Sequence, residues 1–425
     1  MTGFHRAERW SPVGVVTEQK RDNNGKREID TMKTAAIIGA GNIGRGFIGQ
    51  VFSEGDYEVV YIDVVEKTVN ALNESHAYPL ELVSSAGAER RLIQNVRAVN
   101  GNDRAAAART IADCDICVTC VGAKAIKFVI PNIAAGVRLR YSESGRPLDL
   151  LICENLMDAD QYIHSLLKEE LTEAELASVG LVETSVGRMV PLPDQALLEK
   201  EPLLVRAEPY GVLPCDKDAF KGEIPAVGNL LPVSPFRFMI ERKLYVHNMG
   251  HAVCAYLGKQ KGYKYIWQAI GDPAIRLTVR EAMIESAMAL SQRYGQPLRE
   301  LLCHSGDLIR RFANRSLGDT CERVGADIRR KLAPTDRLTG AARAVMETGG
   351  HPVFIALGAA AALRQFCLDE GGDPAARLAE LSGETEGEYY AQVLRFYDLL
   401  IGGAELSDLF SRADHECTKL FGRII

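Results

Sequence analysis

The chain has 425 residues, nearly three times the length of a typical domain of about 150 residues, so we expect two or three domains with substantial cores. Hydrophobic residues make up 47% and charged residues 25% of the chain, which is an ordinary globular composition. The formal net charge of −6 gives no basic field for nucleic-acid binding. The longest apolar stretch, Val353 to Leu363, is far shorter than the ~20 residues of a membrane span. We interpret it as a buried helix and expect no membrane partner.

Residues 1 to 31 are rich in charged side chains and lack a periodic apolar pattern, which predicts a flexible N-terminal extension. Met32 directly precedes the first clear strand, so it is an alternative start of the chain. The N-terminus has no apolar segment typical of a secretory signal, and the ten cysteines do not follow a disulfide framework. We therefore expect a cytoplasmic protein.

Three cysteines, Cys114, Cys117 and Cys120, have spacings that resemble those of a metal site. They lie in a β-branched run that is typical of a strand, where successive side chains point to opposite faces. Cys117 and Cys120 would then point apart, so we expect buried thiols and no metal ion.

From residue 33 the pattern is a short apolar strand, a glycine turn, a helix and a second strand. The second strand covers residues 57–62, and further strands are predicted in three places along the first half of the chain: residues 116–121, 150–153 and 181–184. Strands that alternate with helices imply a parallel sheet. We predict a Rossmann-like, doubly wound α/β domain over residues 32–230.

Residues 203–234 are interrupted by proline and glycine, which indicates a domain junction. Helical periodicity dominates after Phe236, with long stretches at residues 276–294 and 388–401. We predict a mostly α-helical substrate or catalytic domain over residues 231–425.

The first strand runs into a GxGxxG turn, and Asp63 ends the second strand. This context is the one that a dinucleotide-binding turn requires, because the glycines bring the backbone and the start of a helix close to a pyrophosphate. Asp63 can accept hydrogen bonds from the ribose hydroxyls and would repel a 2′-phosphate, so NAD is favoured over NADP. The predicted cofactor-binding residues are Gly39, Ala40, Gly41, Asn42, Ile43, Gly44 and Asp63.

The helical segment from Glu241 to His251 carries Lys243, Asn248 and His251. At about 100° per residue these positions fall on one side of a helix, as does His247. An oxidoreductase that acts on an alcohol needs a base for the hydroxyl proton and donors for the oxygen. The alternatives are a solvated helix face and a role for His247 instead.

The chain resembles the polyol-specific long-chain dehydrogenases/reductases, the mannitol dehydrogenase family. The resemblance rests on ordered motifs across both halves: residues 39–49, Cys153-Glu-Asn155, Glu241-Arg-Lys-Leu244, Lys243-x4-Asn248-x2-His251, Ala255-Tyr-Leu-Gly258, Arg311-Phe-Ala-Asn314, Arg323-Val-Gly325, Arg330-Lys-Leu332 and Asp336-Arg-Leu338.

The resemblance implies a zinc-independent enzyme that uses NAD to interconvert mannitol 1-phosphate and fructose 6-phosphate. It implies that Lys243 is the general base and that Asn248, His251 and Asn155 polarise the reacting oxygen. Arg323 and Lys331 have the spacing of the family's substrate-holding pair.

One position departs from the family pattern: Gly187 precedes Arg188 where the family usually has Asp-Arg. A carboxylate is therefore missing, which leaves the substrate open between a sugar phosphate, a free polyol and a hexuronate such as fructuronate or tagaturonate. A catalytically inactive NAD-binding sensor is a further alternative. The oligomeric state stays open.

Overall fold

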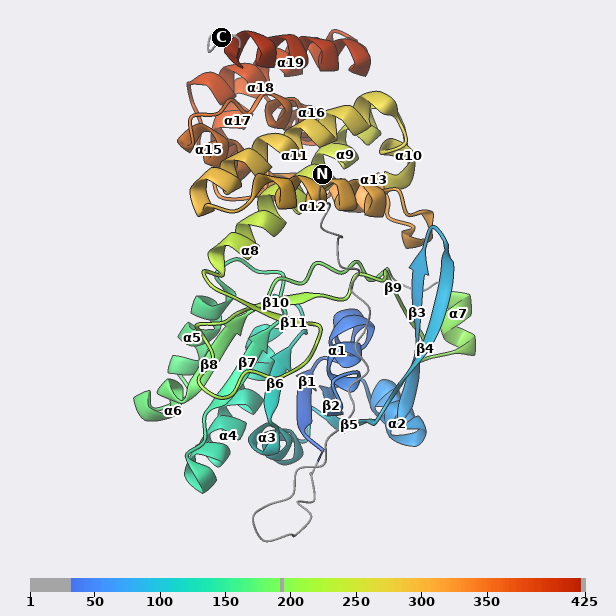
Figure 1. Cartoon of the computed structure of the whole chain (residues 1–425), viewed down its shortest axis with the longest axis vertical. Helices are drawn as coiled ribbons and strands as arrows, with labels where there is room; N and C mark the ends of the chain where they lie inside the picture. Colours follow the sequence, from blue (N-terminus) through green and yellow to red (C-terminus); the bar gives the residue numbers. More distant parts are fainter. Residues whose placement is uncertain (1–31, 192–194, 422–425) are drawn as a thin grey trace, which may run out of the picture.

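The computed structural model describes residues 32–191 and 195–421. The predicted N-terminal extension, residues 1–31, lies outside the described residues. Figure 1 shows an α/β domain below and a helical domain above it. The chain passes from one to the other between β11 (Leu230–Val233) and α8 (Arg237–Glu241). The predicted two-domain fold is confirmed.

A parallel six-stranded sheet forms the centre of the α/β domain, in the order β5-β2-β1-β6-β7-β8. Ile38 at the end of β1 lies opposite Ile62 on one side and Thr119 on the other. Strands of this kind are buried on both faces, which explains their continuous apolar runs. The strands are β1 (Thr34–Ile38), β2 (Glu58–Asp63), β5 (Val96–Asn100), β6 (Ile116–Thr119), β7 (Leu148–Ile152) and β8 (Val179–Glu183).

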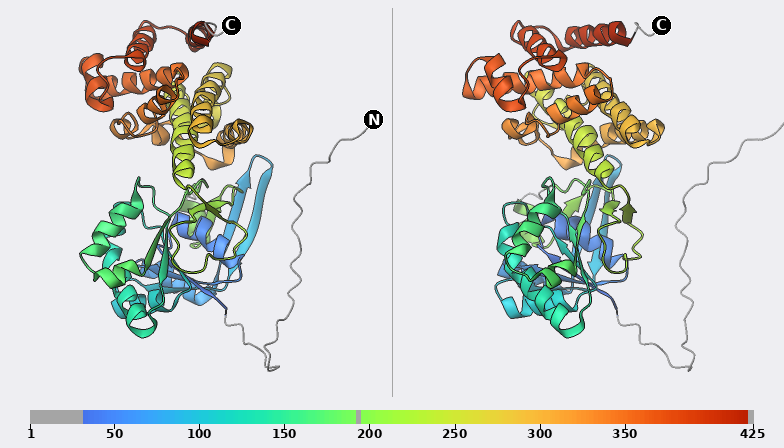
Figure 2. Two further views of the ribbon diagram at one scale, coloured as in Figure 1. Left: turned by 60° about the vertical axis from the view of Figure 1, so that its left-hand side comes forward. Right: turned by 90° about the vertical axis from the view of Figure 1, so that its left-hand side faces the viewer.

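Helices cover the two faces of this sheet (Figure 2). Separate apolar clusters fill the space on each face. Cys114 and Cys117 belong to one cluster, whereas Cys120 packs against the other, so the predicted divergence of Cys117 and Cys120 is confirmed. The elements are η1 (Gly44–Ile48), α1 (Gly49–Ser53), α2 (Glu66–Ser75), α3 (Arg104–Asp113), α4 (Ile126–Ser144), α5 (Ala159–Lys168), α6 (Glu173–Ala177) and α7 (Gln195–Lys200).

The α/β domain also has strands that the sequence pattern did not predict. β3 (Ala77–Ser84) and β4 (Gly87–Gln94) form an antiparallel hairpin, and β9 (Val205–Ala207) pairs with β3 in parallel. The hairpin projects toward the helical domain (Figure 1). Most of β4 is exposed, so it lacks the alternation on which strand prediction depends. β10 (Leu213–Asp216) and β11 pair in parallel across the proline-rich junction.

Every element from Arg237 to Phe421 is helical, apart from a single bridge between Tyr265 and Thr320. The apolar stretch noted above lies in α16, which is buried along most of its length. Further elements are η2 (Arg242–Asn248), α9 (Met249–Gln260), α10 (Ile266–Ala269), α11 (Pro273–Tyr294), α12 (Leu298–Phe312), η3 (Arg315–Leu317), α13 (Cys321–Gly325), α14 (Ile328–Lys331), α15 (Thr339–Glu347), α16 (Val353–Glu370), α17 (Pro374–Ser382), α18 (Glu388–Ile401) and α19 (Leu406–Phe421).

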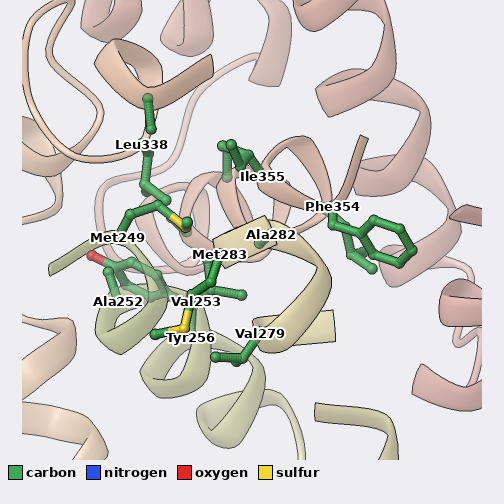
Figure 3. Packing of buried hydrophobic residues seen from close by; sticks show 14 of the residues in the cluster. Met249, Ala252, Val253, Tyr256, Val279, Ala282, Met283, Leu338, Phe354 and Ile355 are labelled. Atoms are coloured by element: carbon green, nitrogen blue, oxygen red, sulfur yellow. The ribbon is translucent and has the colours of Figure 1, made fainter. Parts of the chain in front are cut away.

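The core of the helical domain forms where α9, α11 and α16 pack together (Figure 3). Gly250 in α9 faces Met283 in α11, and a Cβ atom at Gly250 would lie 2.2 Å from the Met283 Cε. The glycine therefore allows close helix packing. No helix among the described residues is long and apolar enough to cross a membrane.

Candidate active site

The segment that carries Lys243, Asn248 and His251 is not a regular α-helix. α8, η2 and α9 follow one another without a break and run from the α/β domain into the helical domain (Figure 2). η2 has π-helical geometry, which is rare and is often found at functional sites. Angles calculated for a regular helix therefore do not apply here. All three side chains still line one cavity, as does His247.

This cavity has a volume of 820 Å³ and lies between the two domains. Its walls come from the glycine turn, the ends of β6 and β7, the segment after β8, the η2–α9 helix and the loop before α13. The residues that line this cavity include Asn42, Ile43, Cys120, Cys153, Asn155, Gly187, Arg188, Lys243, His247, Asn248, His251, Asp319 and Arg323. The volume is within the usual range for small-molecule sites, about 300–1,000 Å³.

The glycine turn at the end of β1 is shaped for close approach. Gly39 has a φ of +106°, and a Cβ atom there would lie 2.8 Å from the Cys120 carbonyl oxygen. A Cβ atom at Gly44 would lie 2.0 Å from the Gly39 carbonyl oxygen. A Cβ atom at Gly41 would meet nothing within 4 Å. Gly39 and Gly44 thus allow the close packing of the turn, while the space beside Gly41 is open.

Asp63 lies beside this turn. Its carboxylate accepts a hydrogen bond from the Ala40 N–H at 2.6 Å and one from the Val65 N–H at 2.9 Å. Each carboxylate oxygen can accept more than one hydrogen bond, so these contacts leave acceptor capacity. The glycine turn and Asp63 therefore lie side by side at the carboxyl ends of β1 and β2. A dinucleotide fits at this edge of the sheet.

Lys243 is part-buried in the cavity wall. Burial, and to a smaller extent the charge of Arg337, lowers the pKa of its ammonium group from 10.5 to about 8, while Cys153 acts in the opposite direction. No ion pair of Lys243 with a carboxylate occurs in the described part of the chain. An amine with this pKa loses its proton readily near neutral pH.

His251 lies one turn beyond η2. Its ring stacks on that of Phe312, with 4.5 Å between the ring centroids and 12° between the planes. Its Nε2 lies 3.5 Å from the Asp319 carboxylate and has no hydrogen-bond partner within the described residues. Burial lowers the pKa of His251 to about 4, although Asp319 raises it. The imidazole is therefore neutral near pH 7, and a neutral ring can donate one hydrogen bond.

His247 lines the same cavity and is more deeply buried. Burial lowers the pKa of His247 well below its usual value, and the charge of Arg311 adds to this effect. The ring centroids of His247 and His251 are 6.2 Å apart. The alternative raised by the sequence therefore remains geometrically open, because both imidazoles are neutral and both reach the cavity.

The remaining predicted residues lie in different places. Asn155, just after β7, is exposed to the cavity, and Arg323 lines its rim with a side chain that is 69% exposed. Arg323 forms an ion pair with Asp319. Lys331 is 4% exposed and does not line the cavity. Burial, followed by the charges of Arg337 and Arg330, lowers the pKa of Lys331 to about 8. The structure brings Asn155 and Arg323 to the cavity but not Lys331.

Two residues near the site had no assigned role in the sequence analysis. Arg337 is the charged neighbour with the largest effect on the pKa of Lys243, and its side chain is 11% exposed. Asp319 lies between His251 and Arg323. Arg337 belongs to the Asp336-Arg-Leu338 motif of the resemblance, but its spacing of 94 positions from Lys243 gives no sign of proximity.

The segment after β8 is fixed by two arginines. Arg188 Nη1 donates hydrogen bonds to the Gly46 carbonyl at 2.9 Å and to Gln50 Oε1 at 2.7 Å. Arg311 from α12 donates to the Gly187 carbonyl and to Glu208. A Cβ atom at Gly187 would lie 3.2 Å from Tyr210 Cε1. Gly187 is therefore packed between an aromatic ring and a cation, at the edge of the cavity.

The described residues contain no group of three or more His, Cys, Asp and Glu side chains that could hold a metal ion. In this protein the glycine turn lies at the switch point of a parallel sheet, and it shares a cavity with a helix of a second domain. This arrangement is found in Rossmann-type dehydrogenases. This arrangement defines the class of the protein.

The chain belongs to the mannitol dehydrogenase family. The family model of the mannitol dehydrogenase Rossmann domain matches residues 33–228, and that of the mannitol dehydrogenase C-terminal domain matches residues 233–381. A protein of Bacillus licheniformis named mannitol-1-phosphate 5-dehydrogenase is 36% identical over 366 residues, which cover 85% of this chain and 94% of the relative. A protein of Bacillus subtilis with the same name has the same identity and coverage.

Solved structures show the same fold. The mannitol 2-dehydrogenase of Pseudomonas fluorescens, in a ternary complex with NAD and D-mannitol, matches with a TM-score of 0.69 and 18% identity, over 90% of this chain and 94% of that chain. A D-sorbitol dehydrogenase in substrate-free form matches with a TM-score of 0.70 and 16% identity, over 93% of this chain and 94% of that chain.

Proposed function

We propose that this protein is an NAD-dependent dehydrogenase that interconverts mannitol 1-phosphate and fructose 6-phosphate. One observation carries the proposal: Lys243, with a lowered pKa, shares a single cavity with the glycine turn, Asn248 and His251. Relatives that are 36% identical over most of the chain are named mannitol-1-phosphate 5-dehydrogenase, which supports the choice of substrate.

The residues present fit a dinucleotide. The open side of Gly41 and the start of the helix at Asn42 and Ile43 suit a pyrophosphate, because free N–H groups at a helix start attract anions. Asp63 suits the ribose hydroxyls. When bound, NAD supplies the hydride acceptor for the oxidation. The absence of a cation at Val64 and Val65 favours NAD over NADP.

Lys243 is the base in this proposal. Its neutral amine takes the proton of the substrate hydroxyl during oxidation, and its ammonium group returns a proton to the carbonyl oxygen during reduction. Asn248, His251 and Asn155 donate hydrogen bonds to the same oxygen, where negative charge develops. The low pKa of His251 keeps it a neutral donor across the working pH range. Arg323 at the rim suits the hydroxyls or phosphate of the sugar.

A cytoplasmic location is part of the same proposal. All ten cysteines are free thiols, a state that a reducing compartment maintains. A sugar phosphate, which is charged, is also a substrate that stays inside the cell that makes it.

The test is the oxidation of NADH with fructose 6-phosphate, fructose and fructuronate as separate substrates. We expect the largest kcat/KM with fructose 6-phosphate. A larger value with fructose or fructuronate would replace the proposed substrate by an unphosphorylated polyol or a hexuronate. NADH binding without turnover of any of the three would favour the sensor alternative.

A further inference from the structure

A second cavity lies on the helical domain, away from the catalytic cavity. It has a volume of 360 Å³ and lies between α11 and α12, which run side by side in Figure 1. Its lining residues are Arg276, Arg280 and Ile284 from α11, and Leu302, Ser305, Gly306, Ile309 and Arg310 from α12. We call it the α11–α12 groove. It is within the size range of small-molecule sites.

The groove is lined by three arginines and three apolar side chains, and two of the apolar ones, Ile284 and Leu302, lie toward one end. Only three residues separate α11 from α12, so the two helices form an antiparallel hairpin. Ile284 and Leu302 lie nearer this turn than Arg276, Arg280 and Arg310 do. Measured along each helix, the arginines lie about one to two helical turns farther from this connection than Ile284 and Leu302 do. The Leu302 side chain is accessible, because Leu302 is 38% exposed.

Few acidic side chains neutralise the positive charges of the arginines in the groove. Arg276 forms no ion pair with any described residue. Arg280 and Arg310 each contact an acidic neighbour on their own helix, Glu281 at 3.5 Å and Asp307 at 3.3 Å. Such exposed pairs contribute only about 0–1 kcal/mol. No Asp or Glu lines the groove itself. A local cluster of three cations in a chain with a net charge of −6 therefore remains available to an anion.

The shape of α12 also leaves room for a ligand. Gly306 lies on the groove side, and a Cβ atom there would meet only the Arg310 guanidinium, at 3.8 Å. Guanidinium groups bind phosphate oxygens in a bidentate manner. We propose that the α11–α12 groove binds a nucleotide, with the phosphates at the cluster of arginines and the flat base on Ile284 and Leu302.

α12 connects the groove to the catalytic cavity. Ile309 and Arg310 line the groove, and the next two residues, Arg311 and Phe312, hold Gly187 and His251 in place. Helices transmit small shifts along their length as rigid elements. A ligand in the groove therefore changes the position of the His251 ring, and we expect it to alter kcat or KM.

The test measures ATP binding by calorimetry, with saturating NADH present to block the dinucleotide site. We expect ATP to bind more tightly than pyrophosphate or adenosine. The double variant Arg276→Ala/Arg280→Ala should weaken ATP binding at least tenfold, whereas the control Arg412→Ala, an exposed arginine on α19, should not. Thermal unfolding of each variant checks that the fold is intact.

Equal ATP affinity in the wild type and the double variant would overturn the site. Pyrophosphate that binds as tightly as ATP would overturn the assignment of a nucleotide. ATP that binds without changing NADH oxidation by the preferred sugar would overturn the link through α12. The binding measurement does not depend on which sugar the enzyme reduces, so its failure is distinct from a failure of the proposed function.

Discussion

The ring of His251 stacks on the ring of Phe312, with 4.5 Å between their centroids and 12° between their planes. This contact joins α9 to α12 and fixes the direction of an imidazole that has no hydrogen-bond partner of its own among the described residues. The stacking, and not a hydrogen bond, therefore orients His251 toward the cavity.

The first prediction concerns this contact. Phe312→Leu should lower kcat about tenfold, because a donor that is poorly placed stabilises the developing oxyanion less. NADH affinity should change little. Phe366→Leu is the matched control, since Phe366 and Phe312 are each 2% exposed. Both variants should lose about 1–3 kcal/mol of unfolding free energy. A similar fall in kcat for both would show that the loss is one of general stability.

The second prediction concerns the role of Lys243. Lys243→Ala should abolish turnover and leave NADH binding largely intact. In the wild type, kcat/KM for oxidation should rise with pH and level off above about 8, because only the neutral amine accepts the hydroxyl proton. For reduction, kcat/KM should instead fall as the pH rises above about 8, since the ammonium form donates the proton. Lys168→Ala, at an exposed position on α5, serves as the control. Retained turnover in Lys243→Ala would refute the base assignment.

The third prediction concerns Arg337, whose charge lowers the pKa of Lys243. Arg337→Met removes that charge, so the pKa of Lys243 should rise and the plateau of the oxidation profile should move to higher pH. Arg337→Lys keeps the positive charge and should keep the plateau close to that of the wild type. The measurement is the pH dependence of kcat/KM for mannitol 1-phosphate. Identical profiles for both variants would exclude an electrostatic effect of Arg337.

The fold was predictable from the sequence where the pattern of apolar residues matches the side chains that are buried in the structure. The glycine turn after Thr34–Ile38 and the apolar strands of the central sheet mark a Rossmann-like domain, and the boundaries of α18 follow from periodicity alone. The β3–β4 hairpin was missed, because β4 is exposed and has no apolar face to reveal it. β4 is held by its pairing with β3, which ends only two residues before β4 begins.

From the residue pattern alone, the candidate site was predictable only where its residues are close in sequence. Asn155 and Arg323, which also line the cavity, were predicted from the family resemblance. Lys243, Asn248 and His251 lie within nine positions, so their shared face appears in the pattern, although the π-helical geometry of η2 does not. Arg337 and Asp319 reach the site through the packing of α9 against later helices. Distant contacts of this kind leave no periodic signal.

The fourth prediction addresses the carboxylate that is missing at Gly187. Gly187→Asp would place a negative charge in the wall that Gly187 shares with Lys243, so the pKa of Lys243 should rise. The oxidation plateau should move to higher pH accordingly. Gly187→Asn has a side chain of similar size without the charge and is the matched control, since both must fit beside Tyr210, 3.2 Å from the new Cβ. If the plateau moved as far in Gly187→Asn as in Gly187→Asp, the change would be caused by the size of the side chain and not by its charge.

The last prediction concerns the ion pair between Glu208 and Arg311, which joins the α/β domain to α12. Arg311 Nε donates to Glu208 Oε2 at 2.8 Å, and the two side chains are 10% and 2% exposed for Arg311 and Glu208, respectively. Glu208→Gln leaves the guanidinium with only the partly exposed Asp307 carboxylate, 3.9 Å away, as a counter-charge, and breaking a buried ion pair typically costs about 3–5 kcal/mol. We expect a lower midpoint of urea unfolding, and a lower kcat because Arg311 also holds Gly187.

The control for this prediction is Glu201→Gln, which breaks the ion pair between Glu201 and Arg90. Those side chains are 37% and 55% exposed, and exposed pairs contribute only about 0–1 kcal/mol. The unfolding midpoint should therefore hardly change. If Glu208→Gln were as stable as Glu201→Gln, the buried ion pair would contribute no more to stability than the exposed one.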